Sequence, residues 1–208
     1  MGVAQTKWTR QPGQRPQQIM AAALDVFSEK GFERATMEEI AKASGVTKGT
    51  IYLYFQNKEE LFIQTLRAHV QEVLTLLPTF SFSTGDSMES QVRTLSQAVL
   101  RVLMTPAMTK VFPLFIAEVK RIPALRQAYI EEWLPRVSFH LASVLEAGVE
   151  AGVFRPHNSG IAARAVLGMF SVFVMTQEVF GVKEITPMPI EAIADTVTTI
   201  FFRGVLAS

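Results

Sequence analysis

Apolar residues recur with a helical period along almost the whole chain, and strand patterns are scarce. Between Gln17 and Lys30 the apolar positions are three and four residues apart, as on one face of an amphipathic helix, and Gly31 follows as a typical C-terminal cap. Pro135 is expected to kink the longest later helix. The sequence predicts an all-α fold of about nine helices. Outside the N-terminal region, helices are expected over 88–104, 106–120, 123–152, 161–180 and 189–206, with a loop over 78–87.

The N-terminal region combines short helices with a tight turn. Thr36-Met37-Glu38-Glu39 has the capping-box pattern and predicts a helix over 37–43. Ser44-Gly45-Val46 then breaks the helical pattern, and Thr47 is the expected N-cap of a helix over 48–55. Two short helices around a glycine-containing turn predict a helix-turn-helix. A further cap, Asn57-Lys58-Glu59-Glu60, predicts a fourth helix that ends before Pro78.

Composition narrows the class of protein. The chain has 208 residues, of which 49% are hydrophobic, and it contains no cysteine. The absence of cysteine excludes a disulfide scaffold, a thiolate zinc site, an iron–sulfur cluster and a cysteine nucleophile. The longest charge-free apolar stretch, between Arg164 and Glu178, is shorter than the roughly 20 residues of a membrane span. The N-terminal 16 residues are polar and basic, unlike a secretory signal, so a cytoplasmic protein is expected.

Signals of catalysis are missing. The G-x-S-x-G, H-E-x-x-H and G-x-G-x-x-G patterns do not occur, and Lys48-Gly49-Thr50 lacks the glycine spacing of a phosphate-binding loop. The three histidines, His69, His140 and His157, show no metal-ligand spacing. We therefore expect no enzyme activity, no cofactor and no metal.

Positive charge is concentrated near the N-terminus. The whole chain carries 20 Lys and Arg against 19 Asp and Glu, but residues 1–58 hold eight basic and five acidic side chains. This excess is compatible with phosphate contact. Lys7, Arg10 and Arg15 either form an arm that touches DNA or belong to a solubilising tail, and the sequence alone favours neither.

The predicted third helix has two distinct faces. Ile51 and Phe55 lie on one face and are expected to pack inward, whereas Lys48 and Tyr52, four residues apart, lie on another. Gly49 costs about 1 kcal/mol of helix propensity relative to alanine, which makes sense where another molecule must approach the backbone closely. These features predict a recognition helix.

Residues 35–61, ATMEEIAKASGVTKGTIYLYFQNKEEL, resemble the tetracycline-repressor-type (TetR/AcrR) transcriptional regulators. The shared features are a threonine that opens the second helix, Ile-Ala within it, a Gly-Val turn, Lys-Gly and Tyr-x-Tyr-Phe in the third helix, and Lys-x-x-Leu after it. The resemblance implies three parts: an N-terminal arm over 1–14, a DNA-binding domain over 15–62, and a helical ligand-binding and dimerisation domain over 63–208.

Carried over residue by residue, the resemblance implies a set of DNA-facing positions. Lys48 and Thr50 would contact base edges or phosphates in the major groove, and Tyr52, Tyr54 and Lys58 would mainly position the DNA backbone. Core packing is the alternative for both tyrosines. The complete predicted set is Thr36, Thr47, Lys48, Gly49, Thr50, Tyr52, Tyr54 and Lys58.

One recognition helix reads only a few base pairs, so a homodimer on an inverted-repeat operator is expected. The last two predicted helices are apolar almost all round, which favours burial against a second copy in a four-helix bundle. The alternative is that both helices complete the core of one chain. The expected interface residues are Val166, Phe170, Phe173, Ile193, Val197, Ile200 and Phe201.

Methionine and aromatic residues of the middle helices suggest a pocket for a small apolar or amphipathic effector. Ordinary core packing is the alternative for each of them. The predicted lining is Met104, Met108, Phe112, Phe115, Trp133, His140, Phe170, Phe173 and Gln177. The resemblance implies a repressor that such an effector releases from DNA. The competing interpretation is a helical small-molecule-binding protein or enzyme without a DNA role.

Overall fold

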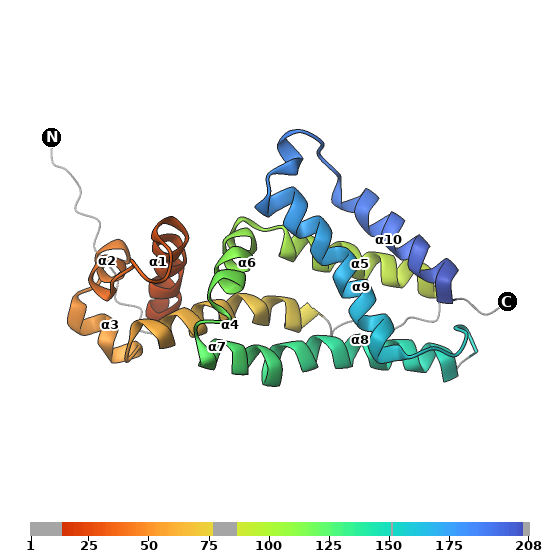
Figure 1. The fold of residues 1–208 in the computed structure, drawn as a ribbon, viewed down its shortest axis with the longest axis horizontal. Coiled ribbons are helices and arrows are strands. Elements are labelled where there is room, and N and C mark those ends of the chain that lie inside the picture. Colours follow the sequence, from red (N-terminus) through yellow and green to blue (C-terminus); the bar gives the residue numbers. More distant parts are fainter. Residues whose placement is uncertain (1–13, 77–86, 151, 206–208) are drawn as a thin grey trace, which may run out of the picture. The chain divides into compact units, whose positions relative to one another are not determined.

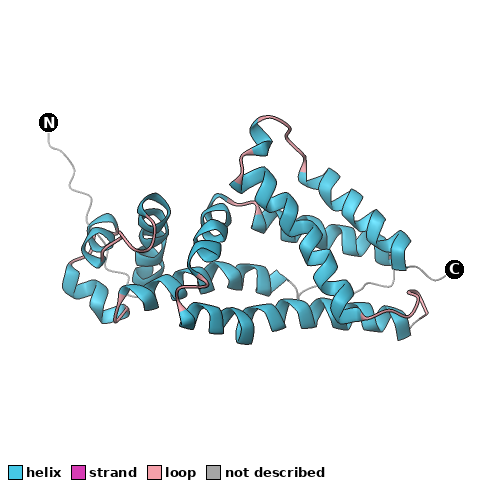
Figure 2. Ribbon diagram, in the orientation of Figure 1, coloured by secondary structure: helices cyan, strands magenta, loops and turns pink. Residues whose placement is uncertain are grey.

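The computed structural model of the protein describes residues 14–76, 87–150 and 152–205, and within these it contains helices and no strand (Figure 2). The predicted all-α fold is confirmed. The chain divides into two compact units, Met1–Thr65 and Leu66–Ser208. The predicted arm residues Lys7 and Arg10 and most of the predicted loop over 78–87 lie outside the described residues.

The first unit holds α1 (Arg15–Lys30), α2 (Met37–Ala43), α3 (Lys48–Tyr54) and the start of α4 (Lys58–Leu76) (Figure 1). Phe27, Phe32 and Phe62 bring their rings together, with centroids 4.9–5.8 Å apart, and so join α1, the following loop and α4. Gly31 ends α1 with φ of 77°, and its N–H donates to the carbonyl of Phe27 at 2.8 Å. The predicted cap residue is confirmed.

The N-terminal caps that predicted the starts of three helices are present in the structure. Thr36 and Glu39 form the reciprocal capping box of α2. Thr47 accepts from the backbone N–H of Thr50 at the start of α3, and Asn57 accepts from the N–H of Glu60 at 2.8 Å before the first turn of α4.

The second unit contains the rest of α4 and six further α-helices, of which α10 packs on α5 and α9, and α8 packs on α9. Between α7 and α8 lies the π-helical turn η2 (Tyr129–Trp133). Their bounds are α5 (Met88–Leu103), α6 (Pro106–Glu118), α7 (Pro123–Ala128), α8 (Leu134–Glu150), α9 (Ser159–Val174) and α10 (Ile190–Val205). In the described residues α7, η2 and α8 run without a break, so the ten α-helices form nine continuous segments, as predicted.

The expected disturbance at Pro135 takes the form of that π-turn. The N–H of Leu134 donates to the carbonyl of Tyr129, five residues back, just before the proline. Proline has no N–H to donate and its ring crowds the preceding turn, so a locally widened helix accommodates it. A second π-turn, η3 (Met175–Val179), continues α9 to the end of the predicted helix over 161–180.

Three helices share a hydrophobic core in the second unit. Leu100 of α5 packs against Phe170 of α9 and Val197 of α10, and all three are buried. A second cluster joins Leu145 of α8 to Phe154 and to the end of α10. The core of one chain therefore already buries one face each of α9 and α10.

Candidate nucleic-acid interface

The turn between α2 and α3 is held from both sides. Gly45 adopts φ of 67°, a left-handed conformation that favours glycine. Val46 donates its N–H to the carbonyl of Ala41 at 3.0 Å, and the hydroxyl of Ser44 donates to the carbonyl of Ile40 at 2.8 Å. Gln18 of α1 donates to the carbonyl of Ser44 at 2.8 Å. These bonds fix the conformation of the turn and tie it to the end of α2 and to α1.

The third helix separates an inner from an outer face, as predicted. Ile51 is fully buried, whereas Tyr52 is 44% exposed and Tyr54 is 37% exposed. An added Cβ at Gly49 would meet only Oγ1 of Thr47, at 3.9 Å. Both tyrosines therefore lie at the surface of the first unit and not in its core.

Leu53, which the sequence reasoning did not single out, is 82% exposed on the same helix. An exposed leucine between two exposed tyrosines is an apolar contact surface. Its exposure could have been predicted from its position within Tyr-x-Tyr-Phe, because a residue between two outward-facing side chains on a short helix has little access to the core.

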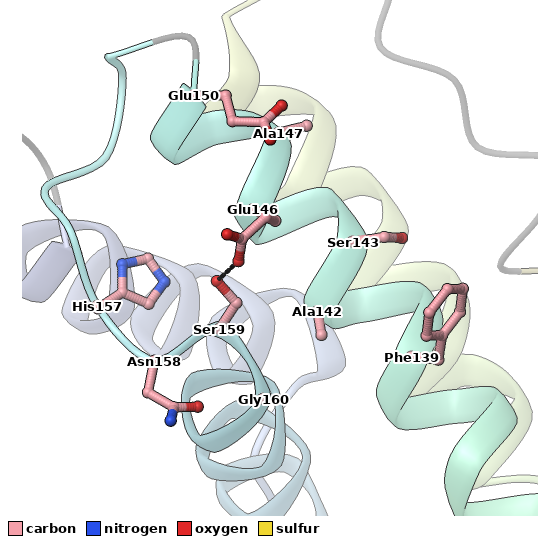
Figure 3. A pocket seen from close by; sticks show the side chains of 10 residues that line it. All are labelled: Phe139, Ala142, Ser143, Glu146, Ala147, Glu150, His157, Asn158, Ser159 and Gly160. Carbon is pink, nitrogen blue, oxygen red and sulfur yellow. Dashed lines mark hydrogen bonds between the residues drawn. The ribbon is translucent and has the colours of Figure 1, made fainter.

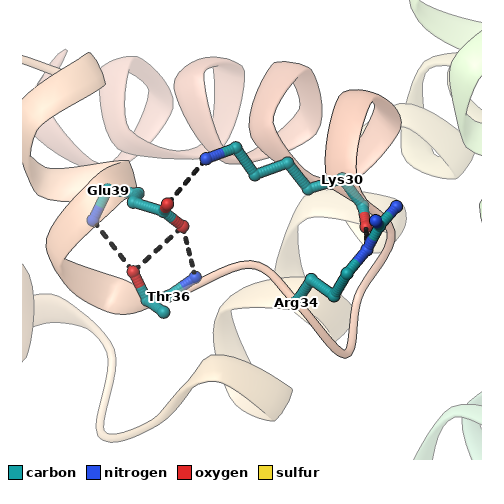
Figure 4. A network of polar contacts seen from close by, with 4 residues as sticks. All are labelled: Lys30, Arg34, Thr36 and Glu39. Atoms are coloured by element: carbon teal, nitrogen blue, oxygen red, sulfur yellow. Dashed lines mark hydrogen bonds and ion pairs between the residues drawn. The ribbon is translucent and has the colours of Figure 1, made fainter.

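The three predicted threonines all serve as cap or cap partner. Oγ1 of Thr36 lies 3.0 Å from Oε2 of Glu39, whose other oxygen accepts from Nζ of Lys30 at 2.6 Å (Figure 4). Oγ1 of Thr47 lies 2.8 Å from Oγ1 of Thr50. A hydroxyl oxygen has two lone pairs and one proton, so capping leaves room for a further contact.

Lys58, predicted to face DNA, has an internal role that the sequence did not indicate. Its ammonium donates to the carbonyls of Phe32 at 2.7 Å and Glu33 at 2.9 Å, and it lies 4.5 Å from the centroid of the Phe32 ring. These contacts tie the start of α4 to the loop before α2 and use two of the three ammonium protons.

An ion pair connects the two helices of the motif. Nζ of Lys48, the first residue of α3, donates to Oε1 of Glu38 in the first turn of α2. The hydrogen bond and charge of Lys48 lower the pKa of Glu38, and the same contact raises the pKa of Lys48. Both groups are therefore charged at neutral pH.

The predicted effector residues have different surroundings in the structure. Met104 and Phe173 pack against the core that contains Phe170, so these three are part of the hydrophobic core. Phe115 instead lies 6.1 Å from Trp133 between ring centroids. Of the remainder, Met108 and Gln177 are buried, and Phe112 and His140 are half-buried.

An open pocket of about 610 Å³ lies at the end of α8 and the start of α9 (Figure 3). Phe139 and Glu150 line it, and Oγ of Ser159 donates to Oε2 of Glu146 at 2.5 Å on its wall. None of the predicted effector residues lines this pocket.

Four of the seven predicted interface residues are already buried within a single chain. Val166, Phe170, Ile193 and Val197 are at most 9% exposed in a single chain. Their apolar character has an explanation within one chain, because α5 packs on α10 and covers the face that α10 shares with α9. Among the rest, Phe173 and Phe201 are half-buried, and Ile200 is 59% exposed.

The segment Ser159–Val179 is long and apolar enough to cross a membrane by length and composition, and 28% of its most apolar window is buried within the chain. It packs on α8 and α10 as part of a helical unit. In the described residues no three His, Cys, Asp or Glu side chains are grouped so that they could hold a metal ion.

Comparison with known proteins places both units in one family. Residues 19–65 match the bacterial regulatory proteins of the tetR family, and residues 90–204, more than half of the chain, match the C-terminal domain of AefR-like transcriptional repressors. The HTH-type transcriptional regulator YhgD of Bacillus subtilis is 27% identical over 201 residues, which cover 93% of this chain and 98% of YhgD.

Solved structures agree over nearly the full length. A TetR-family regulator from Mesorhizobium loti superposes with a TM-score of 0.73 at 25% identity, covering 96% of this chain and all of that one. The flavonoid-responsive regulator FrrA gives a TM-score of 0.70 at 26% identity, with 93% and 98% of the two chains covered. The capped helix-turn-helix, the helical second unit and these matches together show that the chain belongs to the TetR family of DNA-binding transcriptional regulators.

Proposed function

We propose that the protein binds an inverted-repeat operator as a homodimer in the cytoplasm, represses transcription there, and leaves the DNA when a small apolar or amphipathic effector binds the second unit. The outward face of α3 carries this proposal: Lys48 and Gly49 at its start and Tyr52 one turn later are exposed, and hydrogen bonds hold the turn that precedes them. No catalytic activity is part of the proposal.

The residues of α3 would make different contacts with DNA, according to the chemistry of their side chains. Lys48 and Thr50 offer donors to base edges and phosphates, and the tyrosine hydroxyls of Tyr52 and Tyr54 position the backbone. To the predicted set we add Leu53, whose exposed side chain suits apolar contact with a thymine methyl group. Thr36 and Thr47 would contribute their backbone-capping hydroxyls to phosphate contacts.

The dimer is supported by faces of α9 and α10 that the chain does not cover. On α9, Ile161 and Val172 are 67% and 59% exposed, and on α10 Ile200 is 59% exposed. Gly168, in the interior of α9, is also exposed, and an added Cβ there would meet no atom within 4 Å. A glycine in a helix interior weakens the helix, so open space around Gly168 favours close approach of a second copy.

Two observations support the effector: an aromatic cluster and, in the described part of the chain, buried polar atoms without a hydrogen-bond partner. Phe115 lies 4.9 Å from Tyr129 and 6.1 Å from Trp133 between ring centroids. In the described residues, Oε2 of Glu118 and Nε1 of Trp133 are buried without a hydrogen-bond partner. Buried polar groups are costly when unpaired, so a ligand with an apolar body and a polar end would relieve that cost. FrrA, a structural relative, is by its name responsive to a flavonoid.

The DNA-binding part of the proposal is tested with Tyr52→Ala. Removing the exposed ring and hydroxyl should weaken binding to the operator by about 1–3 kcal/mol, because the proposed role of Tyr52 is DNA contact and its side chain lies outside the core. Fluorescence anisotropy on the DNA that flanks the coding region measures this, with sedimentation as the check that the oligomeric state is unchanged. Unaltered affinity would mean that a different face of the motif meets the DNA.

The effector part is tested by thermal unfolding with two probes, a flavonoid such as naringenin and the fatty acid dodecanoate. A ligand that binds only the folded state stabilises it by about 2.7 kcal/mol at a concentration 100 times its Kd. We expect at least one probe to raise the melting temperature and to lower operator affinity in parallel. Stabilisation without release from DNA would contradict the proposed repressor mechanism.

A further inference from the structure

The ammonium of Lys48 is already engaged within the protein before any DNA is present. It donates to the carboxylate of Glu38, one helix away in the same motif. The Lys48 and Glu38 side chains are 60% and 59% exposed. Because neither is buried, the ion pair is open to competition from any anion that approaches the start of α3.

The two consecutive acids at the start of α2 have different partners. Glu39 completes the capping box with Thr36 and pairs with Lys30, so it belongs to the local structure of α2. Glu38 has no part in the capping box, and its carboxylate accepts from Lys48. Exposed ion pairs add little to stability. The contact is therefore better explained by its effect on Lys48 than by its effect on folding.

A carboxylate held against an ammonium has the same sign of charge as a DNA phosphate. Nonspecific DNA binding arises almost entirely from phosphate contacts by lysine and arginine. While Glu38 holds Lys48, the pair is neutral as a whole and attracts phosphates weakly. Base edges in the major groove offer hydrogen bonds in a fixed geometry, which a random sequence does not supply at the same place.

We propose that Glu38 is a specificity-determining residue. Its carboxylate holds the ammonium of Lys48 away from the phosphates of random-sequence DNA and releases it only when a duplex presents matching base edges. This inference rests on the proposed contact of Lys48 with DNA. Loss of the ion pair disfavours every complex in which Lys48 turns to DNA. Only in the operator complex do the contacts of Lys48 with base edges supply enough binding free energy to compensate for the lost ion pair. Glu38 therefore lowers affinity for random DNA more than affinity for the operator.

The test compares Glu38→Gln with the wild type on two duplexes, one of random sequence and one selected in vitro with the wild-type protein. We expect Glu38→Gln to tighten binding to the random duplex about two- to fivefold, the scale of an exposed ion pair. Binding to the selected duplex should tighten less, so the ratio of affinity for the selected duplex to affinity for the random duplex falls. Anisotropy between about 50 and 200 mM salt should give a steeper salt dependence for the variant, by up to about 0.9 in the logarithmic slope.

Two further variants separate the possible causes. Glu29→Gln removes an exposed acid of α1 and makes the same change in net charge, so it should alter the affinity ratio much less. Lys48→Met keeps a side chain of similar length without its charge. In the Lys48→Met background, Glu38→Gln should have no effect on the ratio, because there is no ammonium left to release. Circular dichroism melts check that all variants fold.

Each result has a defined consequence. If Lys48→Met binds both duplexes like the wild type, the proposed DNA contact of Lys48 fails, and this inference fails with it. If Lys48→Met weakens operator binding but Glu38→Gln leaves the affinity ratio unchanged, only the role of Glu38 is overturned. The same holds if Glu38→Gln acts equally with and without Lys48, since its effect would then be general charge repulsion.

Discussion

At the scale of single residues, Gly148 of α8 shows where close packing requires a glycine. A Cβ on Gly148 would lie 2.2 Å from Cδ2 of Phe154, a side chain only 2% exposed. The carbonyl of Gly148 also accepts from the N–H groups of Val153 and Phe154, at 2.9 and 3.0 Å. The end of α8 and the turn after it can therefore pack this closely only around glycine.

Gly148→Ala should destabilise the second unit by about 1–3 kcal/mol, the usual cost of forcing an extra methyl group into a packed core. The ring of Phe154 cannot move aside freely, because it packs edge-on against Phe202 at 5.5 Å. Urea denaturation measures the change. Gly160→Ala is the matched control, since its Cβ would make an ordinary contact at 3.5 Å with Oδ1 of Asn158. Equal stability of the two variants would contradict the packing described.

Residues whose roles depend on near neighbours in the chain could be predicted, and residues whose roles depend on distant packing could not. Thr36 and Thr47 were identified as caps because a cap bonds within three residues. Lys58 was assigned to DNA by resemblance alone, yet its ammonium binds carbonyls 25 and 26 residues away. No local pattern reports a contact of that kind.

At the scale of the helix, the capping box of α2 predicts a pH dependence of stability. The hydrogen bond from Lys30, followed by that from Thr36, lowers the pKa of Glu39 below its usual value of 4.5. A carboxyl whose pKa is lower in the folded state stabilises the fold above its unfolded pKa. That contribution is lost as the pH falls through the folded value.

The melting temperature of the wild type should therefore exceed that of Glu39→Gln at neutral pH, and the difference should shrink as the pH is lowered below about 4.5. Calorimetry between pH 7 and about pH 3 follows it. Glu59→Gln, at an exposed position in the first turn of α4, provides the comparison for a change of one charge. A difference that does not depend on pH would show that the carboxylate of Glu39 is not the stabilising group.

Helix positions were predicted more accurately than helix partners. The bounds of α2 agree with the prediction because its start and its end are encoded in adjacent residues. The burial of Val166 and Val197 was assigned to a second copy, because an apolar helix looks the same whichever surface covers it. Only the packing of α5 on α10 distinguishes the two cases.

At the scale of the whole molecule, operator recognition depends on two helix-turn-helix units held at a fixed spacing. Two helix-turn-helix units bind half-sites about 34–36 Å apart, or at multiples of that distance. Whatever holds two copies together therefore sets which operators fit. In the proposed dimer this is the uncovered face of α9 and α10, which includes Ile161, Val172 and Ile200.

Ile200→Asp places a charge at the proposed dimer surface without entering the core, because the side chain is 59% exposed in a single chain. Burial of an unpaired charge is strongly unfavourable, so sedimentation should show the mass of one 23.1 kDa chain instead of two. Operator affinity should fall far more than affinity for random DNA, because each monomer keeps its phosphate contacts but loses the second half-site. Ile185→Asp, at a position 85% exposed in the segment between η3 and α10, makes the same chemical change and should leave the dimer intact. A dimeric Ile200→Asp variant would place the interface on another surface of the second unit.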